Sequence, residues 1–369
     1  MPVLLPELRA VLAGRAAAFA PGDGSDVSLA GFAALRVGEP VGDDVAVVVS
    51  TSGTTGKPKG ALLSAAALTA SATATHRRLG GPGSWLLALP AHHIAGLQVL
   101  VRSVVAGTEP VELDVTAGFD VARLPGAIRR LGSTRRYASL VAAQLAKALA
   151  DPAAAEALGE LDAVLLGGGP APQPVRDAAA AAGVTVVRSY GMSETAGGCV
   201  YDGVPLDGVR LRVAADGRVV IGGATLAAGY RNPVDPDPFA EPGWFVTDDL
   251  GALDDSGALR VLGRIDDAIS TGGLTVLPQL VEAVLRSHPA VADCAVFGVA
   301  DDRLGQRVAA AVVATPGHRP PTVAELRSHV AAVLDATAAP REVHRIDALP
   351  RYGIGKLDRA ALVRRFGGG

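Results

Sequence analysis

The sequence predicts an α/β fold: a large domain built on a largely parallel sheet, followed by a small α+β domain. Up to about residue 265, short aliphatic runs alternate with alanine-rich stretches of helical length, as is typical of strands joined by crossover helices. Residues 203–255 are instead rich in Gly, Pro and Asp, which indicates an antiparallel sheet or a small barrel. We therefore predict one domain over residues 1–265 and a second over residues 266–369.

Individual elements follow from apolar periodicity. Leu4, Leu5, Leu8, Val11 and Leu12 recur at helical spacing, so the chain is expected to begin with an amphipathic helix. Apolar, mostly β-branched or aliphatic runs predict strands at residues 45–49, 85–89, 163–166, 184–187, 295–299 and 308–313. Helices are expected at residues 65–75, 141–150, 174–182, 281–287 and 323–334.

Composition excludes several classes of protein. A net charge of −3 over 369 residues offers no bulk attraction to nucleic acid. No apolar run reaches the length of about 18 residues that a membrane helix needs, and the first twenty residues lack the basic start of a signal peptide. The only cysteines, Cys199 and Cys294, lie far apart, which is typical of a reducing compartment. We expect a cytoplasmic protein that binds neither nucleic acid nor membrane.

The most informative segment, Ser50 to Gly60, directly follows the strand predicted at 45–49. Its glycines let backbone N–H groups turn toward phosphate oxygens, its hydroxyls donate further hydrogen bonds, and a lysine supplies charge. The spacing is not that of the Walker loop. The alternative is a glycine-rich turn with solvated lysines. We predict a loop that binds the phosphates of a polyanion through Ser50, Thr51, Ser52, Gly53, Thr54, Thr55, Gly56 and Lys59.

Further segments rich in glycine and in polar or charged residues follow the predicted phosphate loop along the chain. Gly167-Gly168-Gly169 comes after one predicted strand, and the stretch from Arg188 to Thr195 comes after another. Taken alone, the second is explained equally well by a helix-capping Ser/Glu pair. The remaining segments are Gly243–Gly251, Gly263–Asp267 and Pro350–Arg359.

Together these segments resemble the ordered motifs of the adenylate-forming superfamily of acyl-CoA synthetases, adenylation domains and luciferases. The resemblance runs from Ser50 to Arg359, and it implies that family's fold, with a small mobile C-terminal domain. It also implies ATP, Mg²⁺ and CoA as co-substrates or cofactors of an acid–thiol ligase.

The resemblance assigns roles in the first domain. Glu194 would bind Mg²⁺, since a hard cation prefers carboxylate oxygen. Ser193, a catalytic candidate with Glu194, stands where threonine is usual and would keep the hydroxyl contact with phosphate. Tyr190 would stack on adenine. Asp249 would accept the ribose hydroxyls, and Arg264 would contact ribose and phosphate. The residues expected close to the adenosine are Gly167, Gly168, Gly169 and Gly191.

Roles in the second domain are assigned in the same way. Asp266 would be the hinge, Gly272 and Gly273 would line the CoA channel, and Lys356 would be catalytic, because a cation stabilises the charge that develops when a carboxylate attacks phosphate. Two positions depart from the usual motifs. Asp248 replaces a glycine and is expected to face solvent, and Tyr352 replaces a small hydroxyl residue.

The stretches Leu89–Arg102 and Ser139–Gln144 resemble the o-succinylbenzoate–CoA ligases of menaquinone biosynthesis, in their short actinobacterial form. This implies His93, Arg102 and Ser139 as contacts of the acid. The acid that this resemblance implies is a dicarboxylate, and its non-reacting carboxylate would need a cationic partner. The alternative for Arg102 is a charge on a helix surface whose stem snorkels past apolar neighbours.

Three functions remain open at this stage: the o-succinylbenzoate–CoA ligase, another acyl-CoA ligase or an enzyme that loads a carrier protein, and a non-catalytic nucleotide-binding relative. The last is disfavoured because Glu194, Asp249, Arg264 and Lys356 are all present. The partners expected are the small-molecule acid, ATP and CoA. The oligomeric state, a homodimer included, stays open.

Overall fold

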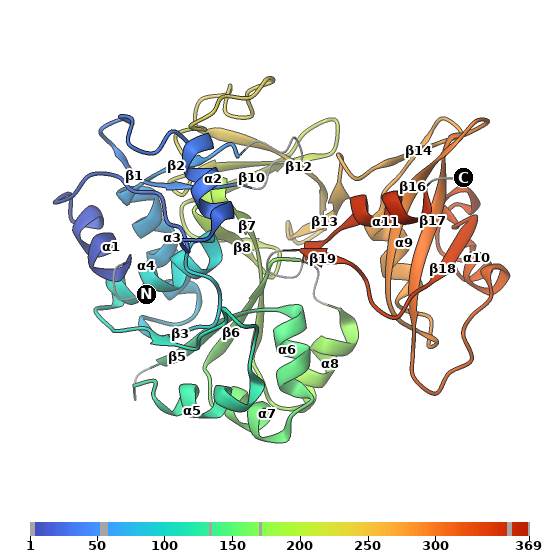
Figure 1. The fold of residues 1–369 in the computed structure, drawn as a ribbon, viewed down its shortest axis with the longest axis horizontal. Coiled ribbons are helices and arrows are strands. Elements are labelled where there is room, and N and C mark those ends of the chain that lie inside the picture. The colour runs from blue at the N-terminus through green and yellow to red at the C-terminus, as the bar shows by residue number, and fades with distance from the viewer. Residues whose placement is uncertain (1–3, 52–57, 133–134, 170–171, 353–355, 368–369) are drawn as a thin grey trace. The chain divides into compact units, whose positions relative to one another are not determined.

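The computed structural model describes residues 4–51, 58–132, 135–169, 172–352 and 356–367. These residues form two compact units, each described by itself below (Figure 1). The first unit comprises Met1–Arg212, Val220–Val246 and Asp254–Leu259, and the second comprises Val213–Val219, Thr247–Leu253 and Arg260–Gly369. The domain division after residue 265 stays a prediction.

The first unit is built on a seven-stranded sheet. Its strands in spatial order are β4 (Val111–Glu112), β3 (Gly83–Leu87), β5 (Arg135–Val141), β6 (Ala163–Gly167), β7 (Val186–Met192), β8 (Gly197–Tyr201) and β9 (Val204–Pro205). The first five strands are parallel to one another, and the β7–β8 and β8–β9 pairs are antiparallel. The largely parallel sheet predicted from the alternating pattern is confirmed, and the antiparallel edge was not predicted.

Helices cover both faces of this sheet, because successive strand residues point to opposite sides. Trp85, Tyr137 and Leu165 belong to one buried cluster, and their neighbours Leu86 and Ala138 belong to the other. The first cluster packs against α1 (Leu4–Leu12), α3 (Ala65–Arg78) and α4 (Ile94–Ala106). The second packs against η1 (Val121–Arg123), α5 (Leu124–Arg129), α6 (Ala142–Leu149), α7 (Pro152–Gly159) and α8 (Gln173–Ala181). Figure 1 shows the four α-helices of this set grouped together.

A separate antiparallel pair, β1 (Val45–Val49) and β2 (Ala61–Ser64), brackets the predicted phosphate loop. All five residues of β1 are buried, as expected for the apolar run. Val49 pairs with Ala61, so the chain leaves and re-enters this small sheet at one end. Ser64 then caps α3 by accepting a hydrogen bond from the backbone N–H of Ala67 at 3.0 Å. Upstream of β1 lies α2 (Asp26–Ala34).

Residues 209–264 form a four-stranded sheet in the order β10 (Val209–Val213), β11 (Arg218–Gly223), β12 (Trp244–Leu253) and β13 (Leu259–Arg264). The links from β10 to β11 and from β12 to β13 are too short for a crossover, so both pairs are antiparallel hairpins. An antiparallel sheet or a small barrel was predicted for this region, and the structure has this four-stranded sheet there.

The second unit has its own sheet, in the order β15 (Leu274–Val276), β14 (Ile269–Thr271), β17 (Gly305–Ala314), β16 (Val291–Asp301), with β18 (Glu342–Arg345) beside β17. Cys294 and Val296 of β16 pack toward α9 (Pro278–Leu285) and α10 (Val323–Ala331). Ala295 and Phe297 pack toward α11 (Arg359–Phe366). The predicted α+β tail is thus confirmed. The remaining short elements are η3 (Ala336–Ala338), β19 (Arg351–Tyr352) and β20 (Lys356–Leu357).

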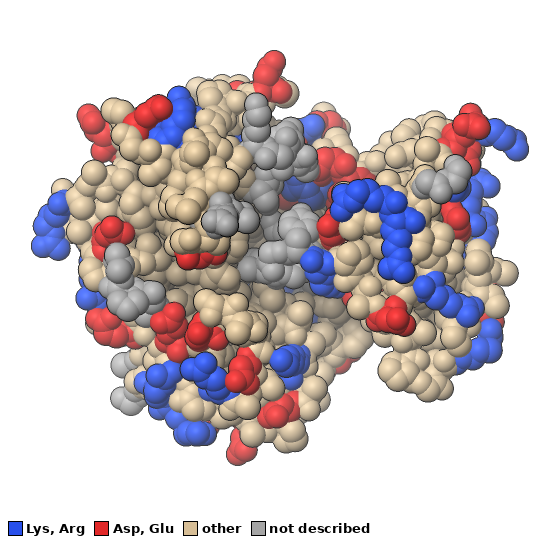
Figure 2. Space-filling view, viewed as in Figure 1, with Lys and Arg blue, Asp and Glu red and all other residues tan. Residues whose placement is uncertain are grey.

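Surface features agree with the composition. On the face shown in Figure 2, basic and acidic side chains are interspersed. None of the described helices has the length and apolarity that crossing a membrane requires.

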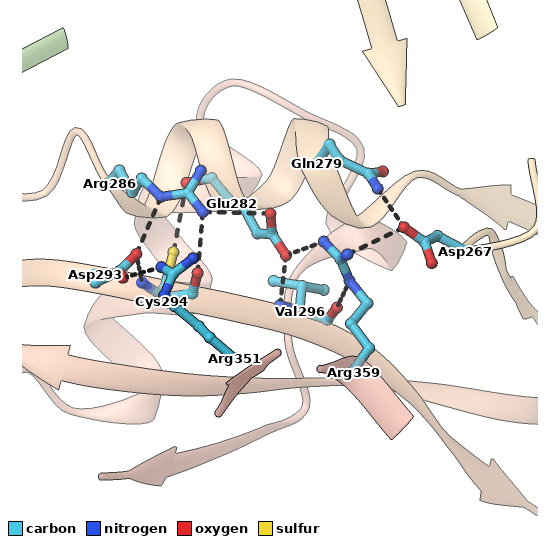
Figure 3. A network of polar contacts seen from close by, with 9 residues as sticks. All are labelled: Asp267, Gln279, Glu282, Arg286, Asp293, Cys294, Val296, Arg351 and Arg359. Atoms are coloured by element: carbon cyan, nitrogen blue, oxygen red, sulfur yellow. Dashed lines mark hydrogen bonds and ion pairs between the residues drawn. The ribbon is translucent and has the colours of Figure 1, made fainter. Parts of the chain in front are cut away.

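A buried ion network ties α11 to α9 and β16 (Figure 3). Glu282, whose side chain is 3% exposed, accepts from Arg359 at 2.6 Å and lies 3.4 Å from a guanidinium nitrogen of Arg286. It also accepts from the backbone N–H of Val296 at 2.9 Å. Arg359 reaches Asp267 at 3.0 Å as well. One carboxylate therefore fixes the start of α11, three residues after Lys356, against the core of the second unit.

We expect Glu282→Gln to lower the free energy of unfolding of the second unit by about 1–3 kcal/mol, because two arginines lose a buried counter-charge. Glu342→Gln is the matched control: it removes a more exposed ion pair with Arg307, which should cost about 0–1 kcal/mol. Hydrogen exchange of β16 amides, Val296 among them, measures the loss. Equal protection in the two variants would contradict a structural role for Glu282.

Candidate active site

Some predicted site residues of the first unit lie at the carboxyl ends of strands of the seven-stranded sheet or directly after them. The carboxyl ends of parallel strands meet at the same edge. Gly167 ends β6 opposite Val141 of β5, and Leu166 pairs with Arg188 of β7. His93 follows β3 and caps α4. Arg135, by contrast, begins β5 and pairs with Asp162 at 3.4 Å, so it lies at the opposite edge.

The predicted phosphate loop is described at its two ends. Ser52, Gly53, Thr54, Thr55 and Gly56 lie outside the described residues. Ser50 is exposed, directly after β1. The Thr51 hydroxyl is buried and has no hydrogen-bond partner among the described residues. A buried, unsatisfied hydroxyl is costly, and a phosphate oxygen would satisfy this one.

Residues 58–62, which follow the predicted phosphate loop, are hydrogen-bonded to the segment 227–232. No site residue was predicted in that segment. The backbone N–H groups of Arg231 and Asn232 donate to the carbonyls of Gly60 and Lys59, at 2.7 and 2.9 Å. The Asn232 amide donates to the carbonyl of Pro58 at 2.8 Å. Leu62 and Gly229 are joined by a further backbone hydrogen bond of 3.0 Å. The segment thereby adds a strand-like edge to β2.

Glu194 lies in the short turn η2 (Ser193–Thr195), directly after β7. It is 8% exposed, and no described Lys or Arg lies within ion-pair distance of it. The Tyr230 hydroxyl donates to its Oε1 at 2.7 Å. Mg²⁺ is commonly held by one or two carboxylates together with substrate phosphates. A buried carboxylate with no cationic partner among the described residues fits that role.

The turn that presents Glu194 is strained and firmly held. Ala196 has a φ of 50°, which is unfavourable for a residue with a Cβ. Its carbonyl accepts hydrogen bonds from Ser71 at 2.9 Å and from Gln98 at 2.7 Å, both buried. Strain of this kind persists where the surrounding contacts over-determine the backbone, typically at functional sites.

The strand predicted to end at residue 187 runs five residues further in the structure. β7 continues to Met192, so Tyr190 and Gly191 lie within a strand that pairs with β8. A Cβ on Gly191 would stand 2.1 Å from the carbonyl oxygen of Gly197. The antiparallel partner therefore explains this glycine, and the same edge pairing explains why the strand extends past its apolar run. A contact of Gly191 or Tyr190 with adenosine stays a prediction.

In the second unit, acidic residues surround Arg264. Its guanidinium donates to both Asp266 oxygens at 2.8 and 2.7 Å, and it lies 3.5 Å from an oxygen of Asp249 and of Asp248. Partial burial opposes the charge, but hydrogen bonds and the nearby carboxylates raise the pKa of Arg264. The Asp248 side chain is 46% exposed and also approaches Arg218 at 3.6 Å, which agrees with the expected solvent-facing position.

Two other predicted positions of the second unit have local structural explanations. Gly272 and Gly273 form the two-residue turn between β14 and β15, with φ of 58° and 81°, and such turns require positive φ at both positions. Lys356 pairs through its backbone with Tyr352; its side chain lies outside the described residues. Roles in CoA passage and catalysis stay predictions for these residues.

Arg102 is buried in the first unit, with 3% of its surface exposed. Its guanidinium lies 4.8 Å from the Trp85 ring centroid and donates to the hydroxyls of Ser139 and Tyr201 at 3.4 Å each. No described carboxylate lies within 4.0 Å, and its Nε lacks a partner among those residues. The snorkelling surface interpretation is therefore wrong, because Arg102 faces the sheet rather than solvent.

Burial lowers the pKa of Arg102, and burial together with the charge of Arg102 lowers the pKa of His76 to about 4. His76 is therefore neutral at pH 7, and it accepts a hydrogen bond from the ring N–H of Trp85 at 3.4 Å. The hydrogen bond between Arg102 and Ser139 brings these two predicted acid-binding residues into contact. His93 is half-buried beside His92, with ring centroids 4.3 Å apart.

Several residues that shape this site were not predicted. Tyr230 and Asn232 lie in the stretch rich in Gly, Pro and Asp for which only an antiparallel sheet or a small barrel was predicted, without any site residue. Gln98 is a further residue that was not predicted to belong to the site. It is fully buried, and its Oε1 lacks a partner among the described residues.

Two family models match the chain, that of the AMP-binding enzymes over residues 9–230 and that of their C-terminal domain over residues 280–356. The chain is 73% identical over 368 residues to the probable 2-succinylbenzoate–CoA ligase of Mycobacterium tuberculosis (strain ATCC 25618 / H37Rv), covering 99% of this chain and 96% of that protein.

Solved structures are similar as well. The o-succinylbenzoate CoA synthetase of Bacillus subtilis in complex with the acyl-adenylate intermediate matches with a TM-score of 0.74 and 33% identity, over 86% of this chain and 69% of that one. The same enzyme with ATP and magnesium ion matches with a TM-score of 0.73 and 32% identity, over 86% and 70%. The chain belongs to the AMP-binding, adenylate-forming enzyme family and, within it, to the 2-succinylbenzoate–CoA ligases.

Proposed function

We propose that this protein is an acid–thiol ligase that joins o-succinylbenzoate to CoA at the expense of ATP, in menaquinone biosynthesis. Its relatives carry the name of this ligase, and the matching Bacillus subtilis structures hold the acyl-adenylate or ATP with magnesium. The order of its motifs along the chain agrees with this assignment.

The reaction has two steps. A carboxylate oxygen of the acid attacks the α-phosphorus of ATP, the bond to the pyrophosphate oxygen breaks, and an acyl-adenylate and pyrophosphate result. The CoA sulfur then attacks the acyl carbon, the bond to the AMP oxygen breaks, and the thiol proton passes to solvent. Lys356 is the cation proposed to stabilise the charge that develops in the first step.

Contacts with ATP are proposed for described groups of each unit separately. Thr51 and Lys59 would contact phosphate, and Glu194 would hold Mg²⁺. When bound, the ion neutralises phosphate charge. Asp249 and Arg264 would contact the ribose, and a nucleotide there would compete with the present contacts of Arg264 to its neighbouring carboxylates.

The observation that carries the acid assignment is the buried guanidinium of Arg102. A buried cation is costly unless it is paired. Arg102 is compensated here only by the Trp85 ring and two hydroxyls, among the described residues. A dicarboxylic acid would supply the missing counter-charge with its non-reacting carboxylate, and planar guanidinium groups suit such pairing.

A product assay tests the function. We expect the purified protein, ATP, Mg²⁺, CoA and o-succinylbenzoate to yield AMP, pyrophosphate and the CoA thioester. A panel of monocarboxylic acids of similar size should react much more slowly. ADP and phosphate as products would refute adenylation. A preference for a monocarboxylic acid would replace this ligase by another acyl-CoA ligase.

A cytoplasmic location and the state of assembly belong to the same proposal. Both cysteines are buried and unpaired, and burial raises the pKa of each thiol to about 12. Such thiols are unreactive and suit a compartment without disulfide formation. Light scattering after size-exclusion chromatography distinguishes a monomer from the homodimer.

A further inference from the structure

We propose that Tyr230 is a positioning residue that aligns the metal-binding carboxylate and the phosphate-loop lysine for Mg·ATP. The inference rests on the proposed function, since it takes Glu194 as the metal ligand and Lys59 as a phosphate contact. It adds a residue that none of the motifs in the sequence contains.

Tyr230 contacts an anion with its hydroxyl and a cation with its ring. The hydroxyl donates to Glu194 Oε1 at 2.7 Å, and a hydrogen bond to a carboxylate is among the stronger ones in proteins. The Lys59 ammonium lies 5.3 Å from the ring centroid, within the distance of about 6 Å at which a cation is attracted to an aromatic face. One side chain therefore touches both charged groups.

The hydrogen bond determines which carboxylate oxygen is available. Tyr230 occupies Oε1, and no described residue donates a hydrogen bond to Oε2. A carboxylate that ligates a metal is commonly oriented by a hydrogen bond to its other oxygen. Because the hydrogen bond already orders the Glu194 side chain, Oε2 can bind the metal ion without a further loss of rotamer entropy.

Tyr230 is itself held in place. Its ring meets Phe239 edge-on, with centroids 5.5 Å apart and planes at 79°. Its backbone bridges to Ala61 of β2, and nearby Ala227 donates from its N–H to the carbonyl of Glu194 at 2.8 Å. The segment thus joins the turn of Glu194 to the exit of the phosphate loop through both backbone and side chain.

Tyr230→Phe separates the two contacts, because it removes the hydroxyl and keeps the ring beneath Lys59. We expect the affinity for Mg²⁺ in the presence of ATP to fall by about 10–100-fold, the range typical when a group that orients a metal ligand is lost. Binding of ATP in EDTA should stay at the wild-type value.

The experiment is calorimetric titration of ATP into the full-length protein with EDTA and with Mg²⁺, together with electron paramagnetic resonance of Mn²⁺ bound with ATP. Tyr137→Phe is the matched control. It removes another hydrogen-bonded tyrosine hydroxyl, one that donates to the carbonyls of Leu79 and Gly81 at 3.0 and 2.9 Å, and it should leave metal affinity unchanged.

The measurements need neither the acid nor CoA, so the inference and the proposed function can fail separately. Wild-type protein that binds Mg·ATP, with Tyr230→Phe binding it equally well, would overturn the inference alone. A Tyr230→Phe loss of equal size in EDTA and in Mg²⁺ would also overturn it, since that indicates general damage. Wild-type protein that binds no Mg·ATP would overturn the proposed function and the inference with it.

Discussion

Lys356→Ala is expected to slow formation of the acyl-adenylate by about 10²–10³-fold, the effect of removing one preorganised charge-stabilising group. Conversion of supplied acyl-adenylate to the thioester should stay near the wild-type rate, because that step is attack on the acyl carbon and no nucleophile attacks phosphorus. The segment is well anchored for such a role: Asp358 caps α11 by accepting from Ala361 at 2.8 Å, and Arg359 joins the buried carboxylate of Glu282.

Single-turnover kinetics of each half-reaction measure this separation. Lys147→Ala is the control, since Lys147 is exposed on α6 and donates to the carbonyl of Phe119. Equal loss in both half-reactions of Lys356→Ala would mean that the lysine has a structural role. The proposal that one residue serves only the first step would then have to be dropped.

Arg102→Met should raise the KM for o-succinylbenzoate by a factor equivalent to about 2–5 kcal/mol, because the substrate carboxylate would lose its desolvated partner. Binding of ATP should change little. Methionine keeps an apolar chain against Trp85, so packing is largely preserved. Since a buried charge without a carboxylate partner is removed, the variant should unfold at the same temperature as the wild type or at a higher one.

This combination of weaker substrate binding and undiminished stability identifies a binding residue. Arg135→Ala serves as control, because Arg135 lies at the other edge of the sheet and pairs with Asp162; its KM should be unaffected. Arg102→Met with an unchanged KM for the acid would refute the assignment. An unchanged KM together with a lower unfolding temperature would show instead that Arg102 supports the core.

Apolar runs and alanine-rich stretches in the sequence predicted many of the strands and helices. The apolar runs at 45–49 and 163–166 became β1 and β6, and the alanine-rich stretch after Ser64 became α3. The end of one strand was predicted wrongly from its local pattern: the apolar run stops at residue 187, whereas β7 ends at Met192. β7 continues through Tyr190 and Gly191 because β8 pairs with it, and pairing with a later strand is not encoded in the local run of valines.

The candidate site shows the same division. The Ser/Thr/Gly/Lys loop, the Ser193–Glu194 turn and the Arg264–Asp266 pair could be selected from the sequence because phosphate, Mg²⁺ and ribose demand particular chemical groups at short spacings. The environment of Arg102 could not, since Trp85, Ser139 and Tyr201 come from three different strands. Their meeting beside α4 depends on strand order and on which face of the sheet each residue points to.

By itself, the sequence determined which chemical groups are present and in what order, and hence the family and the class of reaction. Only the tertiary structure decided which of those groups meet. It brought Tyr230 to Glu194 and Lys59, and Arg359 to Asp267 and Glu282, across 77 positions in the last case. Contacts over such separations are set by packing of whole elements around a core, whereas a motif reports only what a short stretch of chain can do.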